Sequence, residues 1–152
     1  KIQTPFTLVP ATMQTFVVLF LGMILGYKLA VATVVLYLIE GSIGLPVFAK
    51  GGGFAYLIGP TGGYLTGFIL TAFFSGMIKV KSDPIIIFIY LLFSVSATYI
   101  LGLLGLWNYM GLDKSFNQVF MVGAQPFLLI EVYKILILAV LSKQILKLRK
   151  FI

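Results

Sequence analysis

The chain has 152 residues, of which 61% are hydrophobic and only 10% are charged. Soluble domains carry about 25% charged residues, so this composition predicts an all-α integral membrane protein. Lysine and arginine number 11 against 4 aspartate and glutamate residues, a formal charge of +7. No basic stretch is interleaved with aromatic residues as a nucleic-acid groove requires. We therefore expect the charge to reflect membrane topology, and we expect no nucleic-acid partner.

The sequence contains neither cysteine nor histidine. This excludes disulfides, thiolate and imidazole chemistry, and the usual zinc and haem ligands. No Walker-type glycine motif occurs, and the carboxylates are far apart in the chain, at Glu40, Asp83, Asp113 and Glu131. We therefore predict that the protein is not an enzyme and has no catalytic residue, bound metal or cofactor.

A helix needs about 20 largely apolar residues to cross a lipid bilayer. In chain order, such segments cover residues 11–26, 29–45, 59–78, 84–106 and 119–141. The first two are separated only by a tight turn at Gly26-Tyr27-Lys28, and Pro84 opens the fourth at a position where a missing N–H costs nothing. We predict a single membrane domain over residues 1–152, folded as a helical bundle of about five spans.

Alternation of these spans gathers most of the basic residues on one side of the membrane, namely Lys28, Lys79, Lys81, Lys143, Lys147, Arg149 and Lys150. The positive-inside rule makes that side cytoplasmic. The C-terminus is therefore predicted to be cytoplasmic, and residues 46–58 to form an outward loop. The start of the chain has no signal-peptide pattern, and an odd number of spans leads us to expect a further helix before Lys1.

Small residues recur at every fourth position of the third span, and again around the first turn. They are Gly59, Gly63, Gly67, Thr71 and Ser75, and then Gly22, Gly26 and Ala30. Such stripes allow two helix backbones to approach closely. We favour close packing between spans of this chain; a surface that docks a partner protein is the alternative.

Two ionisable residues, Glu131 and Lys134, fall near the middle of the last predicted span, where each charge costs roughly 2.5 to 3.5 kcal/mol. Three residues apart on a helix, they can pair with each other as a purely structural unit. Charges inside a membrane more often face a cavity or a pathway. We therefore predict that this pair grips a ligand that has a donor end and an acid end.

The predicted outward loop at 46–58 is too apolar for a solvated linker, and we expect it to fold back against the bundle. Its glycines at 51–53 allow positive φ and a close approach of the backbone to a ligand. Phe48, Phe54 and Tyr56 can then form a lid or a stacking wall. A flexible turn is the alternative interpretation.

Several stretches of the chain carry a more specific pattern. They are VPATMQT at 9–15, YL at 37–38 followed by Gly41, GLPVFA at 44–49, GGG at 51–53, GPTGGYL at 59–65 with Gly67 and Phe68, and the set Pro126, Phe127, Glu131 and Lys134. Together they resemble the BioY family, the biotin-specific S components of energy-coupling factor (ECF) transporters. The resemblance implies a six-helix membrane bundle, and we expect the first helix of that family to be missing from this chain. Glu131 stands where the family typically has aspartate.

The resemblance implies a subunit in the cytoplasmic membrane of a prokaryote that captures biotin with high affinity at an outward-facing pocket. It also implies a transmembrane T component and two ATP-binding subunits as partners that energise vitamin uptake. A buried acid such as Glu131 can accept hydrogen bonds from the ureido N–H groups of biotin, and Lys134 or Lys50 can meet its carboxylate. Further candidate substrate-binding residues are Gln14, Tyr37, Gly52, Gly53, Thr61 and Tyr64.

Two functions of other classes stay open. A stand-alone ion- or proton-coupled carrier would use Glu131 as a proton relay and would need no partner subunit, so an uncoupler would abolish its transport. A non-transporting membrane scaffold would use Glu131 and Lys134 as a structural pair. In that case apolar residues could replace both without loss of stability.

Overall fold

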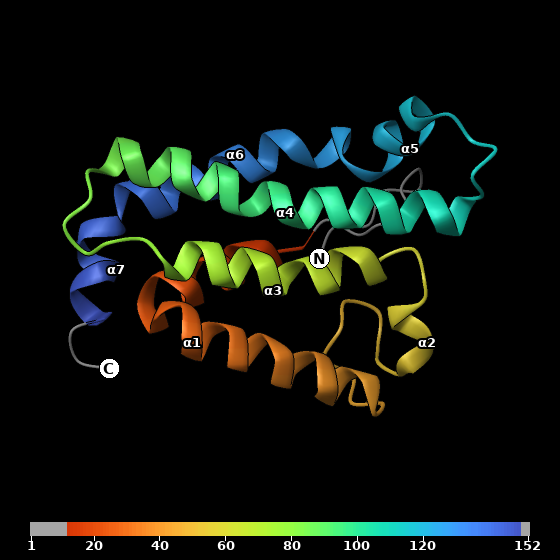
Figure 1. The fold of residues 1–152 in the computed structure, drawn as a ribbon, viewed down its shortest axis with the longest axis horizontal. Coiled ribbons are helices and arrows are strands. Elements are labelled where there is room, and N and C mark those ends of the chain that lie inside the picture. The colour runs from red at the N-terminus through yellow and green to blue at the C-terminus, as the bar shows by residue number, and fades with distance from the viewer. Residues whose placement is uncertain (1–11, 150–152) are drawn as a thin grey trace.

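The computed structural model describes residues 12–149, and within that range it contains helices and no strand (Figure 1). By length and composition, two of these helices can cross a membrane, and two more form a third candidate bent by 48° at a short break. The prediction of an all-α membrane protein is confirmed, while the number of crossings stays a prediction. The helices are α1 (Gln14–Ser42), α2 (Phe54–Leu57), α3 (Gly62–Gly76), α4 (Pro84–Met110), α5 (Phe116–Gly123), α6 (Gln125–Val140) and α7 (Ser142–Leu148).

Helix α1 reverses its direction at Gly26, whose φ of 74° and ψ of 169° lie outside the helical region. Glycine adopts a positive φ without the steric penalty of a Cβ atom. The two halves of α1 run back alongside each other (Figure 1), and the side chain of Gln14 in the first half donates a hydrogen bond to Tyr37 in the second. The tight turn predicted at Gly26 is therefore confirmed.

The small-residue stripe of α3 packs closely against two neighbouring helices. A Cβ atom on Gly67 would lie 2.7 Å from the Cα atom of Thr98 in α4, and the buried hydroxyl of Thr71 lies 2.7 Å from that of Thr98. One turn further along, Ser75 fills the space beside Gly22 of α1, where a Cβ atom would overlap its hydroxyl. The favoured interpretation of the stripe, close packing within the chain, is confirmed.

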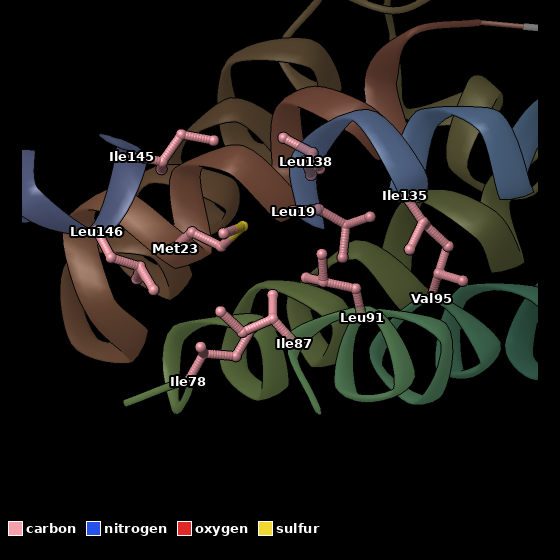
Figure 2. Packing of buried hydrophobic residues seen from close by; sticks show 10 residues of the cluster. All are labelled: Leu19, Met23, Ile78, Ile87, Leu91, Val95, Ile135, Leu138, Ile145 and Leu146. Atoms are coloured by element: carbon pink, nitrogen blue, oxygen red, sulfur yellow. The ribbon is translucent and has the colours of Figure 1, made fainter. Parts of the chain in front are cut away.

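The buried hydrophobic side chains form separate clusters between the helices. One cluster joins α1, α4, α6 and α7 (Figure 2), and it consists of Leu19, Met23, Ile78, Ile87, Leu91, Val95, Ile135, Leu138, Ile145 and Leu146. Another joins both halves of α1 to α3, and it includes Val18, Val34, Leu38, Phe48, Leu65 and Phe68. A third lies between α3, α4, α5 and α6 and includes Tyr64, Leu106 and Phe127. The last two clusters border the pocket described below.

The last long apolar segment is broken between α5 and α6 at Ala124, which has non-helical φ and ψ angles. Pro126 has no N–H and so cannot continue the hydrogen-bond ladder across this point. The N–H of Phe127 donates to the carbonyl of Ala124, which leaves the carbonyl of Gly123 without its usual helical donor. The hydroxyl of Tyr64 takes that place, at 2.8 Å from the Gly123 oxygen.

The loop at 46–58 folds back onto the end of α1, as expected. Phe48 is only 4% exposed, and its ring occupies the space beside Gly41, where a Cβ atom would overlap it. The backbones of Phe48 and Gly51 pair as an isolated antiparallel β-bridge. The N–H of Gly53 donates to the carbonyl of Gly41 at 2.7 Å. These contacts hold the loop and the short helix α2 over one end of the bundle.

Candidate functional site

A pocket lies between the first half of α1, α3, α4 and α6, close to the folded-back loop. The space not filled by protein atoms there amounts to about 610 Å³, open solvent included. The residues that line it are Thr12, Gln14, Thr15, Ala49, Tyr56, Thr61, Tyr64, Leu65, Phe68, Thr98, Tyr99, Phe127, Ile130, Glu131 and Lys134.

The charged side chains of the pocket are Glu131 and Lys134 of α6. They are 4% and 7% exposed, and the Lys134 ammonium lies 3.2 Å from Oε2 of Glu131. The structure thus contains the pair that was the alternative interpretation, and the predicted grip on a ligand stays a prediction. Mutual attraction and hydrogen bonding offset the cost of keeping both charges away from water.

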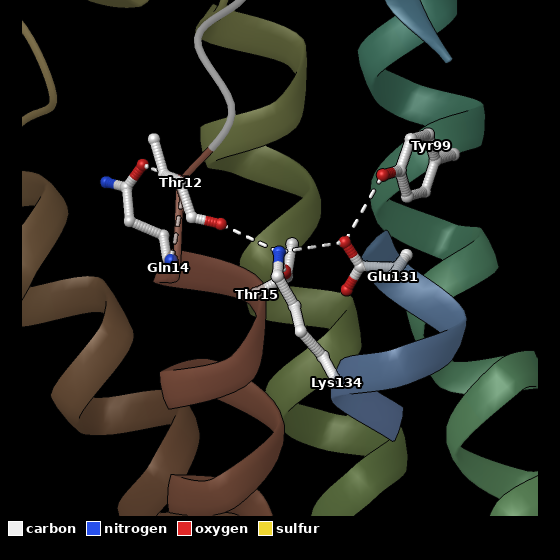
Figure 3. Close-up of polar contacts among 6 residues, drawn as sticks. All are labelled: Thr12, Gln14, Thr15, Tyr99, Glu131 and Lys134. Carbon is white, nitrogen blue, oxygen red and sulfur yellow. Dashed lines mark hydrogen bonds and ion pairs between the residues drawn. The ribbon is translucent and has the colours of Figure 1, made fainter. Parts of the chain in front are cut away.

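The ammonium of Lys134 makes two further hydrogen bonds, both to the beginning of α1 (Figure 3). It donates to the backbone carbonyl of Thr12 at 2.7 Å and to the hydroxyl of Thr15 at 3.0 Å. With the bond to Glu131, these contacts use all three donors of an ammonium group. Lys134 therefore links the N-terminal end of α1 to α6 at one side of the pocket.

The carboxylate of Glu131 is only half used by the residues that the structure describes. Its Oε2 atom accepts from Lys134 and also from the hydroxyl of Tyr99 of α4, at 3.3 Å (Figure 3). Its Oε1 atom is buried and has no hydrogen-bond partner within residues 12–149. A buried acceptor without a donor costs roughly 1 to 3 kcal/mol, and more when it is charged. Glu131 therefore brings to the pocket wall a carboxylate with an acceptor atom that no donor among residues 12–149 uses.

Aromatic rings form much of the remaining wall. Tyr64 and Tyr99 meet edge to face, with ring centroids 6.1 Å apart and planes at 87°. Phe68, Phe127 and Tyr56 also line the pocket. These rings provide an apolar surface next to the free carboxylate oxygen, an arrangement that suits a flat, partly polar molecule.

The structure brings five of the predicted substrate-binding residues to this pocket. They are Glu131, Lys134, Gln14, Thr61 and Tyr64. Tyr64 lines the pocket with its ring, since its hydroxyl is occupied by the carbonyl of Gly123.

Tyr37 lies beside the pocket and not in its wall. Its hydroxyl accepts from Gln14 and donates to the backbone carbonyl of Val47 at 3.2 Å. It lines an adjoining apolar groove between the two halves of α1, which shares Gln14 with the pocket.

The other three predicted residues lie in the loop and do not line the pocket. Lys50 is exposed and follows Ala49, which does line it. A Cβ atom on Gly52 would overlap the carbonyl oxygen of Leu45, and Gly53 has a φ of 109° and bonds to Gly41. The two glycines thus give the loop its shape.

Sequence reasoning missed Thr15 and Tyr99, which both contact the charged pair. Thr15 is 8% exposed, and it stands next to Gln14 in the VPATMQT stretch. The position of Tyr99 in the sequence could have predicted a buried role. Tyrosine in membrane spans is enriched at the membrane interfaces, whereas Tyr99 lies well inside α4. A polar ring in mid-span suggests a buried partner.

The chain is similar in sequence to proteins of a known family. The BioY family model matches residues 1–151. The "Probable biotin transporter BioY" of Pyrococcus horikoshii is 34% identical over 127 residues, which cover 83% of this chain and 74% of that protein. The "Biotin transporter BioY" of Thermotoga maritima is 35% identical over 148 residues, which cover 97% of this chain and 86% of that protein.

A solved structure has the same fold. It is the crystal structure at 2.1 Å of the S-component for biotin from an ECF-type ABC transporter. The two structures superpose with a TM-score of 0.83 at 25% sequence identity, over 96% of this chain and 80% of that one.

Proposed function

The chain belongs to the BioY family, and we propose that it captures biotin at the pocket between α1, α3, α4 and α6. In this proposal it is the substrate-binding subunit of a vitamin uptake transporter and performs no catalysis itself. Its relatives are named biotin transporters and the matching crystal structure is an S-component for biotin, which supports the choice of this substrate. The observation that carries the proposal is Glu131 in the wall of the pocket, whose buried Oε1 atom has no hydrogen-bond partner among residues 12–149.

The chemistry of biotin suits this wall. Biotin has an apolar bicycle, a ureido group with two N–H donors and one carbonyl, and a flexible tail that ends in a carboxylate. A ureido N–H would satisfy Oε1 of Glu131 through a charge-assisted hydrogen bond. The bicycle would then pack against the rings of Tyr64, Phe68, Tyr99 and Phe127.

The remaining predicted residues have supporting roles in this proposal. Gln14 and Thr61 provide polar atoms in the pocket wall. Lys50 meets the biotin carboxylate, because the donors of Lys134 are already engaged and Lys50 is exposed directly after Ala49 of the wall. Tyr37, Gly52 and Gly53 hold the loop at 46–58 in place beside the pocket.

We further propose that uptake depends on an energising module with a transmembrane T component and two ATP-binding subunits. The support is the likeness to a subunit of an ECF-type ABC transporter. The positive-inside distribution of lysine and arginine supports a cytoplasmic C-terminus in a prokaryotic cytoplasmic membrane.

Uptake of radiolabelled biotin by biotin-auxotrophic cells tests this function. Cells that express the chain together with an energising module should accumulate biotin in the presence of an uncoupler as long as ATP is maintained. They should lose uptake when ATP is depleted. The reverse pattern would identify a proton-coupled carrier, and no uptake or binding under any condition would favour a scaffold.

A further inference from the structure

The position of the Lys134 ammonium is set by its acceptors. A lysine side chain is a flexible four-carbon stem with a compact charge at its end, so the stem alone does not fix where the charge lies. Here two of the three acceptors are neutral oxygens, the carbonyl of Thr12 just before α1 and the hydroxyl of Thr15 in its first turn, at 2.7 and 3.0 Å (Figure 3). The third is Oε2 of Glu131 at 3.2 Å.

This arrangement decides which oxygen of Glu131 a ligand can use. The ammonium and the hydroxyl of Tyr99 both bind Oε2, and Oε1 is buried with no partner in the part of the chain that the structure describes. Without the Thr15 hydroxyl, one N–H donor of the buried Lys134 ammonium would lose its acceptor. An unpaired donor on a buried charge is energetically costly. The unpartnered atom Oε1 belongs to the same carboxylate and is a strong alternative acceptor. The ammonium would then compete with the ligand for it.

We propose that Thr15 is a positioning residue for ligand binding: its hydroxyl holds the Lys134 ammonium on the Oε2 side of Glu131, so that Oε1 stays available to a donor group of the ligand. The proposal rests on the proposed capture of biotin at this pocket. Thr15 is suited to the role because it is 8% exposed and lies in the first turn of α1, opposite Lys134.

Substitutions at Thr15 in the full chain, purified in detergent, test the proposal through the Kd for biotin. Thr15→Val keeps the branched shape and removes the hydroxyl, and it should weaken biotin binding about tenfold. Thr15→Ser restores a hydroxyl and should return the Kd to within about twofold of the wild type. Thr66→Val is the matched control, because Thr66 is exposed on α3 and its hydroxyl bonds only to carbonyls of its own helix.

A double-mutant cycle separates positioning from general packing. If Thr15 acts through the ammonium, Thr15→Val should have no further effect on the Kd in a Lys134→Met background. A packing defect would weaken binding equally in both backgrounds. Thermal unfolding of each variant checks that it is folded, and Thr15→Ala serves in the same cycle should Thr15→Val reduce the yield of folded protein.

The results distinguish this proposal from the proposed function. A folded wild-type chain that does not bind biotin overturns both. Biotin binding by the wild type with an unchanged Kd in Thr15→Val overturns the role of Thr15 alone. Failure of Thr15→Ser to restore binding, or equal losses in the two Lys134 backgrounds, also overturns it and leaves biotin capture intact.

Discussion

The hydroxyl of Tyr99 on α4 donates to the same oxygen of Glu131 on α6 that the Lys134 ammonium binds, and the tyrosine contact is 3.3 Å long. Two donors on one carboxylate oxygen hold the group in a fixed orientation, and the other oxygen receives no hydrogen bond from the described residues. The tyrosine thus supports the geometry that we propose for ligand binding, and it does so from a different helix.

Removal of the Tyr99 hydroxyl should therefore weaken biotin binding while the fold persists. For Tyr99→Phe we expect a Kd about three- to tenfold higher, which corresponds to ~0.7 to 1.4 kcal/mol. Isothermal titration with biotin measures it. Tyr133→Phe is the control, because Tyr133 lies on α6 and is 60% exposed. An unchanged Kd in Tyr99→Phe would show that the carboxylate needs no second donor.

The Tyr64 hydroxyl should matter for stability. It donates to the carbonyl of Gly123 at the break between α5 and α6, at 2.8 Å in a buried place. Tyr64→Phe would leave that carbonyl without a donor, at a cost of roughly 1 to 3 kcal/mol. We expect a lower melting temperature in detergent, compared with Tyr109→Phe, whose parent side chain is 56% exposed. Equal melting temperatures would mean that water or another group satisfies the carbonyl.

The contact between α3 and α4 should not tolerate a side chain at Gly67. A Cβ atom there would lie 2.7 Å from the Cα atom of Thr98, so the two backbones would have to separate. Gly67→Ala should therefore reduce the free energy of unfolding by roughly 1 to 3 kcal/mol. Thr66→Ala, a change at the adjacent exposed position, should have little effect. Similar unfolding curves for the two variants would contradict the close packing.

The carboxylate of Glu131 should be needed for binding more than for folding. Lys134→Met alone leaves Glu131 without its buried partner and should destabilise the chain by roughly 3 to 5 kcal/mol. The double variant Glu131→Gln with Lys134→Met removes both charges and should recover much of that stability. We expect it to fold and to fail to bind biotin, as measured by thermal unfolding and titration on the same sample. Biotin binding by the double variant would rule out the carboxylate as the ligand acceptor.

Much of the helical fold follows from local patterns that a sequence reveals. Apolar segments mark helices that can cross a membrane, Pro84 stands at the first position of α4, and the four-residue spacing on α3 marks its close packing. The pairing of Glu131 with Lys134 follows from their spacing of three on one helix. Each of these features depends on neighbours in the chain.

The rest of the site depends on contacts between distant segments. Thr15 and Lys134 are 119 positions apart, and Tyr99 and Glu131 are 32 apart. No periodicity within one helix predicts which faces of two helices meet. The predicted span at 119–141 is broken at Ala124, and the contact by which Tyr64 of another helix satisfies the carbonyl of Gly123 there is equally non-local. Lys50 was predicted as one of two lysines that can meet the biotin carboxylate, and it does not line the pocket.

The central claim is that Glu131 accepts a hydrogen bond from biotin, and isothermal titration of three forms of the chain tests it most directly. The wild type and Glu131→Asp both keep a carboxylate and should bind biotin saturably. Glu131→Gln keeps the shape and loses the charge, and it should bind at least about tenfold more weakly, a loss of ~1.4 kcal/mol or more. Equal binding by Glu131→Gln, or no binding by the folded wild type, would contradict the account.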